Sequence, residues 1–68
     1  MSVDPQEIFE LIVKADERLK YATDANRAQR QQQAIDLLVQ ARDAARDAGQ
    51  EQLVEQAETR LADLQASG

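Results

Sequence analysis

Carboxylates are the most numerous acid–base groups of this chain, and three of them share one face of an expected helix. Glu51, Glu55 and Glu58 follow the i, i+4, i+7 spacing that brings side chains together on a helix, where they could in principle hold a hard cation. Calcium sites use a denser set of oxygen ligands, commonly from a glycine-bearing loop. We therefore interpret the three glutamates as a solvated face and expect no metal and no cofactor.

Nucleophilic and acid–base catalysis lack their usual residues here. The chain has no His and no Cys, which removes the commonest general base and the most reactive nucleophile. Its four hydroxyl side chains of the Ser and Thr type either lie near the chain ends or have no histidine to activate them: Ser2, Thr23, Thr59 and Ser67. We expect no catalytic residue and no enzyme.

A tyrosine and two arginines are the candidate binding residues. Tyr21 falls on the polar side of the first expected helix, and exposed tyrosines are enriched at protein interfaces. Arg27 and Arg30 precede the apolar part of the second helix, and arginine offers a two-pronged donor for a carboxylate. We predict that Tyr21, Arg27 and Arg30 form a polar partner-binding site. The simpler interpretation makes them ordinary turn residues.

Composition limits the partners. Thirteen acidic and eight basic residues give the 68-residue chain a net charge of −5, which opposes binding to nucleic acid. No apolar run is long enough to span a membrane, and no basic segment introduces a signal peptide, so we expect a cytoplasmic protein. We predict that the partner is another protein or a peptide, or a second copy of this chain, and neither nucleic acid nor membrane.

The elements that position these residues are predicted to be helices only. Between Pro5 and Gly49 the chain is dominated by Ala, Leu, Gln, Glu, Asp and Arg, and apolar residues recur at helical spacing. We predict one all-α domain over residues 1–68, an antiparallel up-down-up bundle of three helices at about 5–25, 28–48 and 50–66.

The first helix carries a start signal. Asp4 can accept hydrogen bonds from the free amides of the first turn, and Pro5 suits the first helical position because it has no N–H to lose. Glu7 stands where a capping-box acid would stand, and Val3 with Ile8 matches a hydrophobic staple. The helix is therefore predicted to begin at Pro5.

The pairing of residues between the first two helices predicts where the chain turns from one to the other. A tight turn at Thr23-Asp24 would place polar residues opposite Ala15 and Leu19, so we place the turn around Asn26, which tolerates the left-handed conformation. Gly49 is predicted to end the second helix in that conformation.

The same registers predict the core. Ala41 should lie at the closest approach of the helices, opposite Ala15 and Ala57. Phe9 and Val13 are expected to face the third helix inside a three-way core, which would leave no large apolar patch on the surface.

Residues 22–64 resemble the helices of tetratricopeptide repeats. The resemblance rests on small residues at that family's packing positions, large residues between them and a glycine turn: Ala22, Ala34, Leu38, Ala41, Gly49, Ala57, Leu61 and Leu64. The chain is also similar in size to the three-helix microtubule-interacting-and-transport domain. Both resemblances imply binding of a peptide or protein without catalysis.

Three classes of function remain open. We favour a small non-catalytic helical module for protein–protein interaction. One alternative is a self-assembling, homodimeric helical protein, because a small core is often completed by a second copy of the chain. The other is an acidic regulator that inhibits a basic partner in the manner of an antitoxin.

Overall fold

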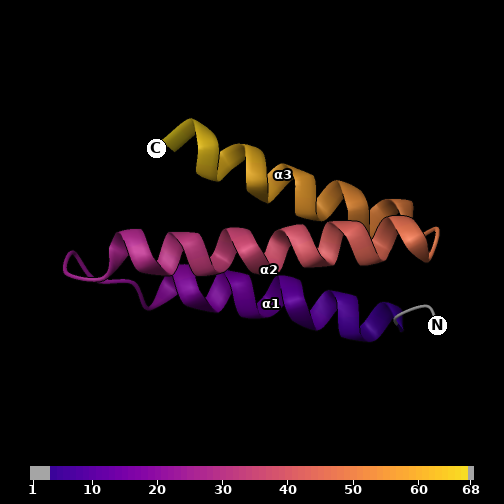
Figure 1. The fold of residues 1–68 in the computed structure, drawn as a ribbon, viewed down its shortest axis with the longest axis horizontal. Helices are drawn as coiled ribbons and strands as arrows, with labels where there is room; N and C mark the ends of the chain where they lie inside the picture. Colours follow the sequence, from indigo (N-terminus) through magenta and orange to yellow (C-terminus); the bar gives the residue numbers. More distant parts are fainter. Residues whose placement is uncertain (1–3, 68) are drawn as a thin grey trace.

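The computed structural model describes residues 4–67, which form three helices and no strand. These are α1 (Pro5–Lys20), α2 (Arg27–Asp47) and α3 (Glu51–Ser67). They run up, down and up, as Figure 1 shows, so the predicted all-α three-helix bundle is confirmed. Within the described part of the chain, no helix has both the length and the apolar character that a membrane span needs.

The central helix α2 carries the other two. α1 and α3 each pack along α2 but make few contacts with each other, so the bundle is flat, with extents of 38 × 20 × 14 Å. In Figure 1 the C-terminal end of α3 diverges from α2. An ion pair spans the outer helices, with Arg60 Nε of α3 donating to Asp16 Oδ1 of α1 at 2.9 Å.

Small side chains dominate the core. Nine of the described residues are buried, and five of them are alanines: Ile8, Ile12, Ala15, Ala34, Leu38, Ala41, Ala45, Ala57 and Leu61. Alanine allows helix axes to approach closely, because the distance between packed helices depends on the side chains at the contact. The predicted site of closest approach is consistent with this core, since Ala15, Ala41 and Ala57 are all fully buried.

Phe9 does not lie in the core, and the prediction that placed it there was wrong. Its side chain is 49% exposed on the surface of α1. The reason is the flat arrangement of the helices. Because α1 and α3 both pack on α2 and make few contacts with each other, no three-way core closes over this ring.

The start of α1 follows its sequence signal. The helix begins at Pro5, and the Oδ1 atom of Asp4 accepts a hydrogen bond from the backbone N–H of Gln6 at 2.9 Å. Glu7 stands in the first turn, where the helix dipole favours an acid. The proposed staple involves Val3, which lies outside the described residues.

The first helix ends earlier than predicted. α1 stops at Lys20, five residues before the expected end at residue 25, and the connection to α2 runs over residues 21–26. The Oδ1 atom of Asn26 accepts the backbone N–H of Thr23 at 2.7 Å. Such a local bond offers the backbone an alternative to the helical hydrogen bond. Asn26 has φ −120°, so the expectation of a left-handed residue there was also wrong.

The turn between α2 and α3 is built as predicted. Gly49 has φ +70°, the conformation that glycine adopts without a steric cost. The N–H of Gln50 donates to the carbonyl of Ala45 at 2.8 Å, and the N–H of Gly49 donates to the carbonyl of Arg46 at 3.1 Å. These two bonds form a Schellman motif, which ends α2 and lets α3 start at Glu51.

We predict that Ala41→Leu lowers the free energy of unfolding by about 1–3 kcal/mol, because Ala41 is fully buried on the central helix and extra methylenes there overpack the core. Gln40→Leu is the matched control, since Gln40 is exposed one residue away. Chemical denaturation measures both. Equal effects at the two positions would show that α2 does not present Ala41 to the core.

Gly49→Ala is expected to cost about 1 kcal/mol of stability, because a left-handed conformation is unfavourable for residues with a Cβ. Outside Gly49 and its two chain neighbours, no atom lies within 4 Å of the added Cβ, so the cost comes from the backbone conformation. Gly49→Asn should therefore cost less than Gly49→Ala in thermal unfolding, since Asn tolerates this conformation better. An alanine variant as stable as the parent chain would contradict the positive φ.

Candidate functional site

A shallow hollow beside the α1–α2 connection gathers most of the basic side chains at that end of the molecule. We call it the basic hollow, and it is lined by Lys14, Glu17, Arg18, Tyr21 and Arg30. Three bases against one acid give it a positive charge in a chain whose net charge is −5. A negatively charged group is therefore the ligand that this surface favours.

Two helices position these side chains. Lys14, Glu17, Arg18 and Tyr21 follow one another at the i, i+3, i+4 and i+7 spacing, which places them on the same face of α1 and its C-cap. Arg30 comes from the first turns of α2 and reaches the hollow from the other side. The site thus depends on how α1 packs on α2 and on the connection between them.

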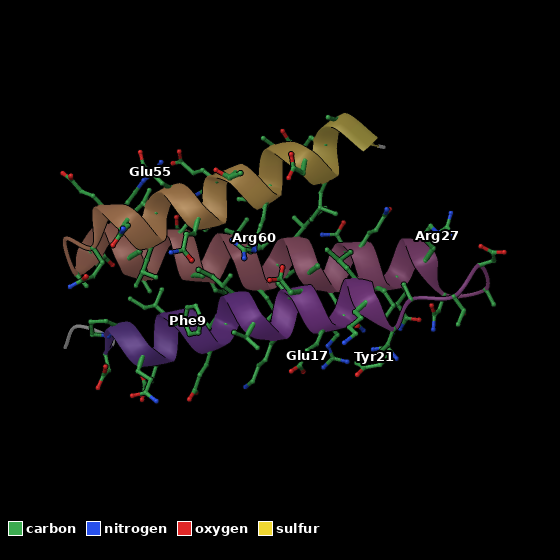
Figure 2. All side chains as sticks on the ribbon, turned by 180° about the vertical axis from the view of Figure 1, so that it is seen from behind. Phe9, Glu17, Tyr21, Arg27, Glu55 and Arg60 are labelled. Carbon is green, nitrogen blue, oxygen red and sulfur yellow. The ribbon has the colours of Figure 1, made fainter. Side chains whose placement is uncertain are left out.

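Tyr21 is the most prominent apolar surface of the hollow. Its side chain is 67% exposed, and Figure 2 shows it on the outer side of α1, close to Glu17. The Nζ atom of Lys20 lies 5.6 Å from the centre of the ring. At this distance an ammonium group attracts the ring face, which favours a fixed position of the tyrosine.

Arg30 retains most of its donors. It is half-buried, and its Nη1 atom donates to Oε1 of Gln33 at the long distance of 3.4 Å. The rest of the guanidinium is available to a ligand, and partial burial makes a charged interaction stronger there than on the open surface.

Arg27 is not part of the hollow. In Figure 2 the side chains of Arg27 and Tyr21 lie on opposite sides of the ribbon. The Nη2 atom of Arg27 donates to Asp24 Oδ1 at 2.8 Å, and both partners are exposed. Of the three predicted partner-binding residues, the structure brings Tyr21 and Arg30 together and leaves Arg27 apart.

Lys14, Glu17 and Arg18 line the hollow but were not among the predicted site residues. Their helical spacing from Tyr21 was the available signal, because it places all four side chains on one face. Arg30 could not be added to this face from periodicity alone, since it comes from the next helix and its placement depends on the connection.

The three glutamates of α3, Glu51, Glu55 and Glu58, do not share one environment. Glu58 pairs with Arg46 of α2, whose Nη2 atom donates to Glu58 Oε1 at 2.6 Å, while Glu51 and Glu55 lie nearer the α2–α3 turn. Across residues 4–67, no group of three or more His, Cys, Asp or Glu side chains is arranged to hold a metal ion.

Charge is distributed unevenly along the molecule. Residues 14–30, at the end with the α1–α2 connection, carry five bases and three acids. Residues 4–13 and 40–55, toward the end with the α2–α3 turn, carry seven acids and two bases. The basic hollow is thus at the positive end of an otherwise acidic molecule.

Comparison of the chain with protein-family models, with curated proteins and with solved structures found no match. The resemblance to tetratricopeptide repeats and to the microtubule-interacting-and-transport domain therefore stays a prediction.

Proposed function

We propose that this protein is a non-catalytic helical module that binds an acidic segment of another protein in the basic hollow. The observation that carries the proposal is the convergence of Arg18, Lys14 and the half-buried Arg30 around an exposed tyrosine, in a chain with an excess of acids. Arginine can bind a carboxylate through two parallel hydrogen bonds, and tyrosine adds rigid contact area.

The surface supports weak and reversible binding. Phe9 and Tyr21 are the exposed large hydrophobic side chains of the described residues, and Figure 2 shows them well separated along α1. Obligate interfaces present a larger continuous apolar patch. We therefore propose a monomer that binds its partner with micromolar affinity, and that loses affinity as salt screens the exposed charges.

The self-assembling alternative is distinguished by mass in solution. A monomer whose mass does not change with concentration supports the interaction module, whereas an obligate dimer supports a structural homodimer. Sedimentation equilibrium measures the mass directly.

We predict that Arg30→Ala weakens binding of an acidic peptide by about tenfold, because it removes a partly buried charge-assisted hydrogen bond. The probe is a fluorescein-labelled peptide of alternating Glu and Leu, measured by fluorescence anisotropy. Tyr21→Ala should also weaken binding, through loss of contact area.

Arg27→Ala is the matched control for Arg30→Ala. It removes the same charge from the same end of the molecule but outside the basic hollow, so it should weaken binding less than about twofold, as expected for an exposed charge. Equal losses in the two variants would show attraction by net charge alone and would contradict the site. A probe peptide in which Gln replaces Glu should bind neither the parent chain nor its variants.

A further inference from the structure

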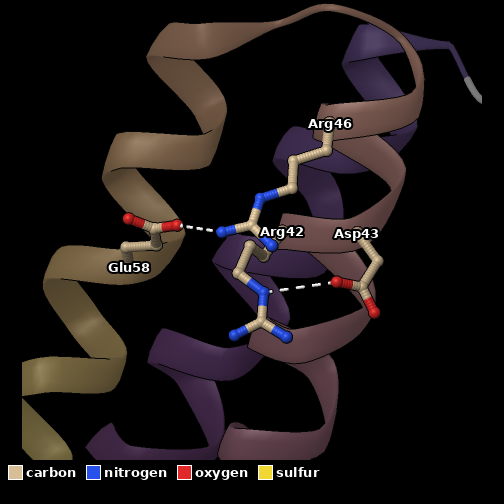
Figure 3. A network of polar contacts seen from close by, with 4 residues as sticks. All are labelled: Arg42, Asp43, Arg46 and Glu58. Atoms are coloured by element: carbon tan, nitrogen blue, oxygen red, sulfur yellow. Dashed lines mark hydrogen bonds and ion pairs between the residues drawn. The ribbon is translucent and has the colours of Figure 1, made fainter.

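The eight basic side chains of the chain all lie within the described residues 4–67, and they divide into two sets by their partners. Four arginines make ion pairs: Arg27 with Asp24, Arg42 with Asp43, Arg46 with Glu58 and Arg60 with Asp16. Figure 3 shows two of these pairs, one within α2 and one from α2 to α3. The charges of these four arginines are therefore compensated inside the molecule.

The other four bases are Lys14, Arg18, Lys20 and Arg30, and none of them makes an ion pair within residues 4–67. Three of them line the basic hollow, and Lys20 lies against the ring of Tyr21, which lines it too. This occurs although acids outnumber bases by thirteen to eight in the chain. Positive charge that the molecule does not compensate is thus concentrated at one place.

Helix stability explains only part of this arrangement. Arg18 and Lys20 stand in the last turn of α1, where the helix dipole favours bases. Lys14 lies outside that turn and one helical turn from Arg18, a spacing at which like charges repel. Arg30 is the fourth residue of α2, near the end where the dipole favours acids. The helix dipoles therefore do not account for Lys14, and they oppose Arg30.

The basic hollow has the charge and the size for one compact dianion. Its three bases and Glu17 give a net charge of +2 around a volume of about 420 Å³. A single carboxylate compensates half of this charge, whereas a phosphate monoester carries about −1.5 to −2 at neutral pH and offers three acceptor oxygens. Lys14 and Arg18 approach from α1 and the half-buried Arg30 approaches from α2, so their donors reach the hollow from two sides.

We propose that the acidic group bound in the basic hollow is the phosphoryl group of a phosphorylated serine or threonine in the partner segment. This inference rests on the proposed function and specifies its ligand. Lys14, Arg18 and Arg30 donate to the phosphoryl oxygens, and the residues that flank the phosphorylated one lie along the ring of Tyr21. A short side chain suits a shallow hollow. Because an unmodified hydroxyl carries no charge, phosphorylation of the partner switches binding on.

The test uses three labelled peptides in fluorescence anisotropy. They share the alternating Glu and Leu sequence of the probe above and differ at the central position, which is phosphoserine, Glu or Ser. The phosphoserine peptide should bind about fivefold more tightly than the Glu peptide, the effect of one further charge interaction, and the Ser peptide should bind most weakly.

The pH dependence identifies the phosphoryl group. A phosphate monoester loses its second proton near pH 6, and the chain has no histidine, the side chain whose charge ordinarily changes in that range. The advantage of the phosphoserine peptide over the Glu peptide should therefore shrink as the pH falls from about 7.5 to about 5.5, where the phosphoryl group keeps a single charge. An advantage that does not change over this range would contradict binding of the dianion.

Arg18→Gln should weaken binding of the phosphoserine peptide by about tenfold, because it removes a charge-assisted hydrogen bond. The matched control is Arg27→Gln, which removes the same charge from an exposed, ion-paired position outside the hollow and should cost less than about twofold. Thermal unfolding of each variant verifies that it is folded. Equal losses in the two variants would overturn the proposal.

Glu17 supplies a test of opposite sign. It is the acid among the described residues of the lining, and it makes no ion pair with the bases around it. Because its charge repels the phosphoryl group, Glu17→Gln should strengthen binding of the phosphoserine peptide by about two- to threefold. Glu55→Gln changes the net charge equally on α3, outside the hollow, and should leave the affinity unchanged.

The outcomes separate this inference from the proposed function. If the phosphoserine and Glu peptides bind equally well, the phosphoryl group is not the ligand, while the acidic-segment module stands. If none of the three peptides binds, the proposed function fails as well. Inorganic phosphate should displace the labelled peptide only weakly. Displacement as effective as that by unlabelled phosphoserine peptide would assign the hollow to free phosphate and overturn the proposal.

Discussion

Packing of two outer helices on the small residues of α2 is the constraint on which this structure depends. α2 buries Ala34, Leu38, Ala41 and Ala45 along its length, and three of these four side chains are a single methyl group. Alanines lose little entropy in a helix and keep neighbouring helix axes close. The isoleucines of α1 and the leucine of α3 supply the larger surfaces that complete the core.

The same arrangement places a hollow at each end of the molecule. Because α1 and α3 share α2 and make few contacts with each other, the bundle stays flat and elongated, with each connection at one end of its long axis. Each connection brings the ends of two helices together, and a hollow forms beside each. Bases gather at the end with the α1–α2 connection and acids at the end with the α2–α3 turn, so charge is divided along the long axis of the molecule.

Local signals predicted the parts of this fold that depend on neighbouring residues. Asp4 with Pro5 marked the start of α1, and Gly49 marked the end of α2, because each acts through backbone groups a few residues away. The end of α1 was placed five residues too late, since a hydrogen bond between an asparagine side chain and a backbone amide leaves no periodic pattern.

Features that depend on distant elements could not be predicted in the same way. Phe9 sits at a core-like position of its helix, but its burial depends on how near α3 approaches, which the pattern of α1 does not contain. For the candidate site, Tyr21 and Arg30 were found from their chemical types, whereas the separation of Arg27 from them follows from its pairing with Asp24 and from the direction of the connection.

Amide hydrogen exchange in the native protein tests the central role of α2 most directly. A helix packed on both sides should open only when the whole protein unfolds, while helices packed on one side can open locally. We predict that the amides around Leu38 and Ala41 exchange most slowly, with an opening free energy equal to that of global unfolding. The last turns of α3, where it diverges from α2, should exchange fastest among the helices. Equal protection of all three helices, or faster exchange in α2 than in α1, would contradict this account.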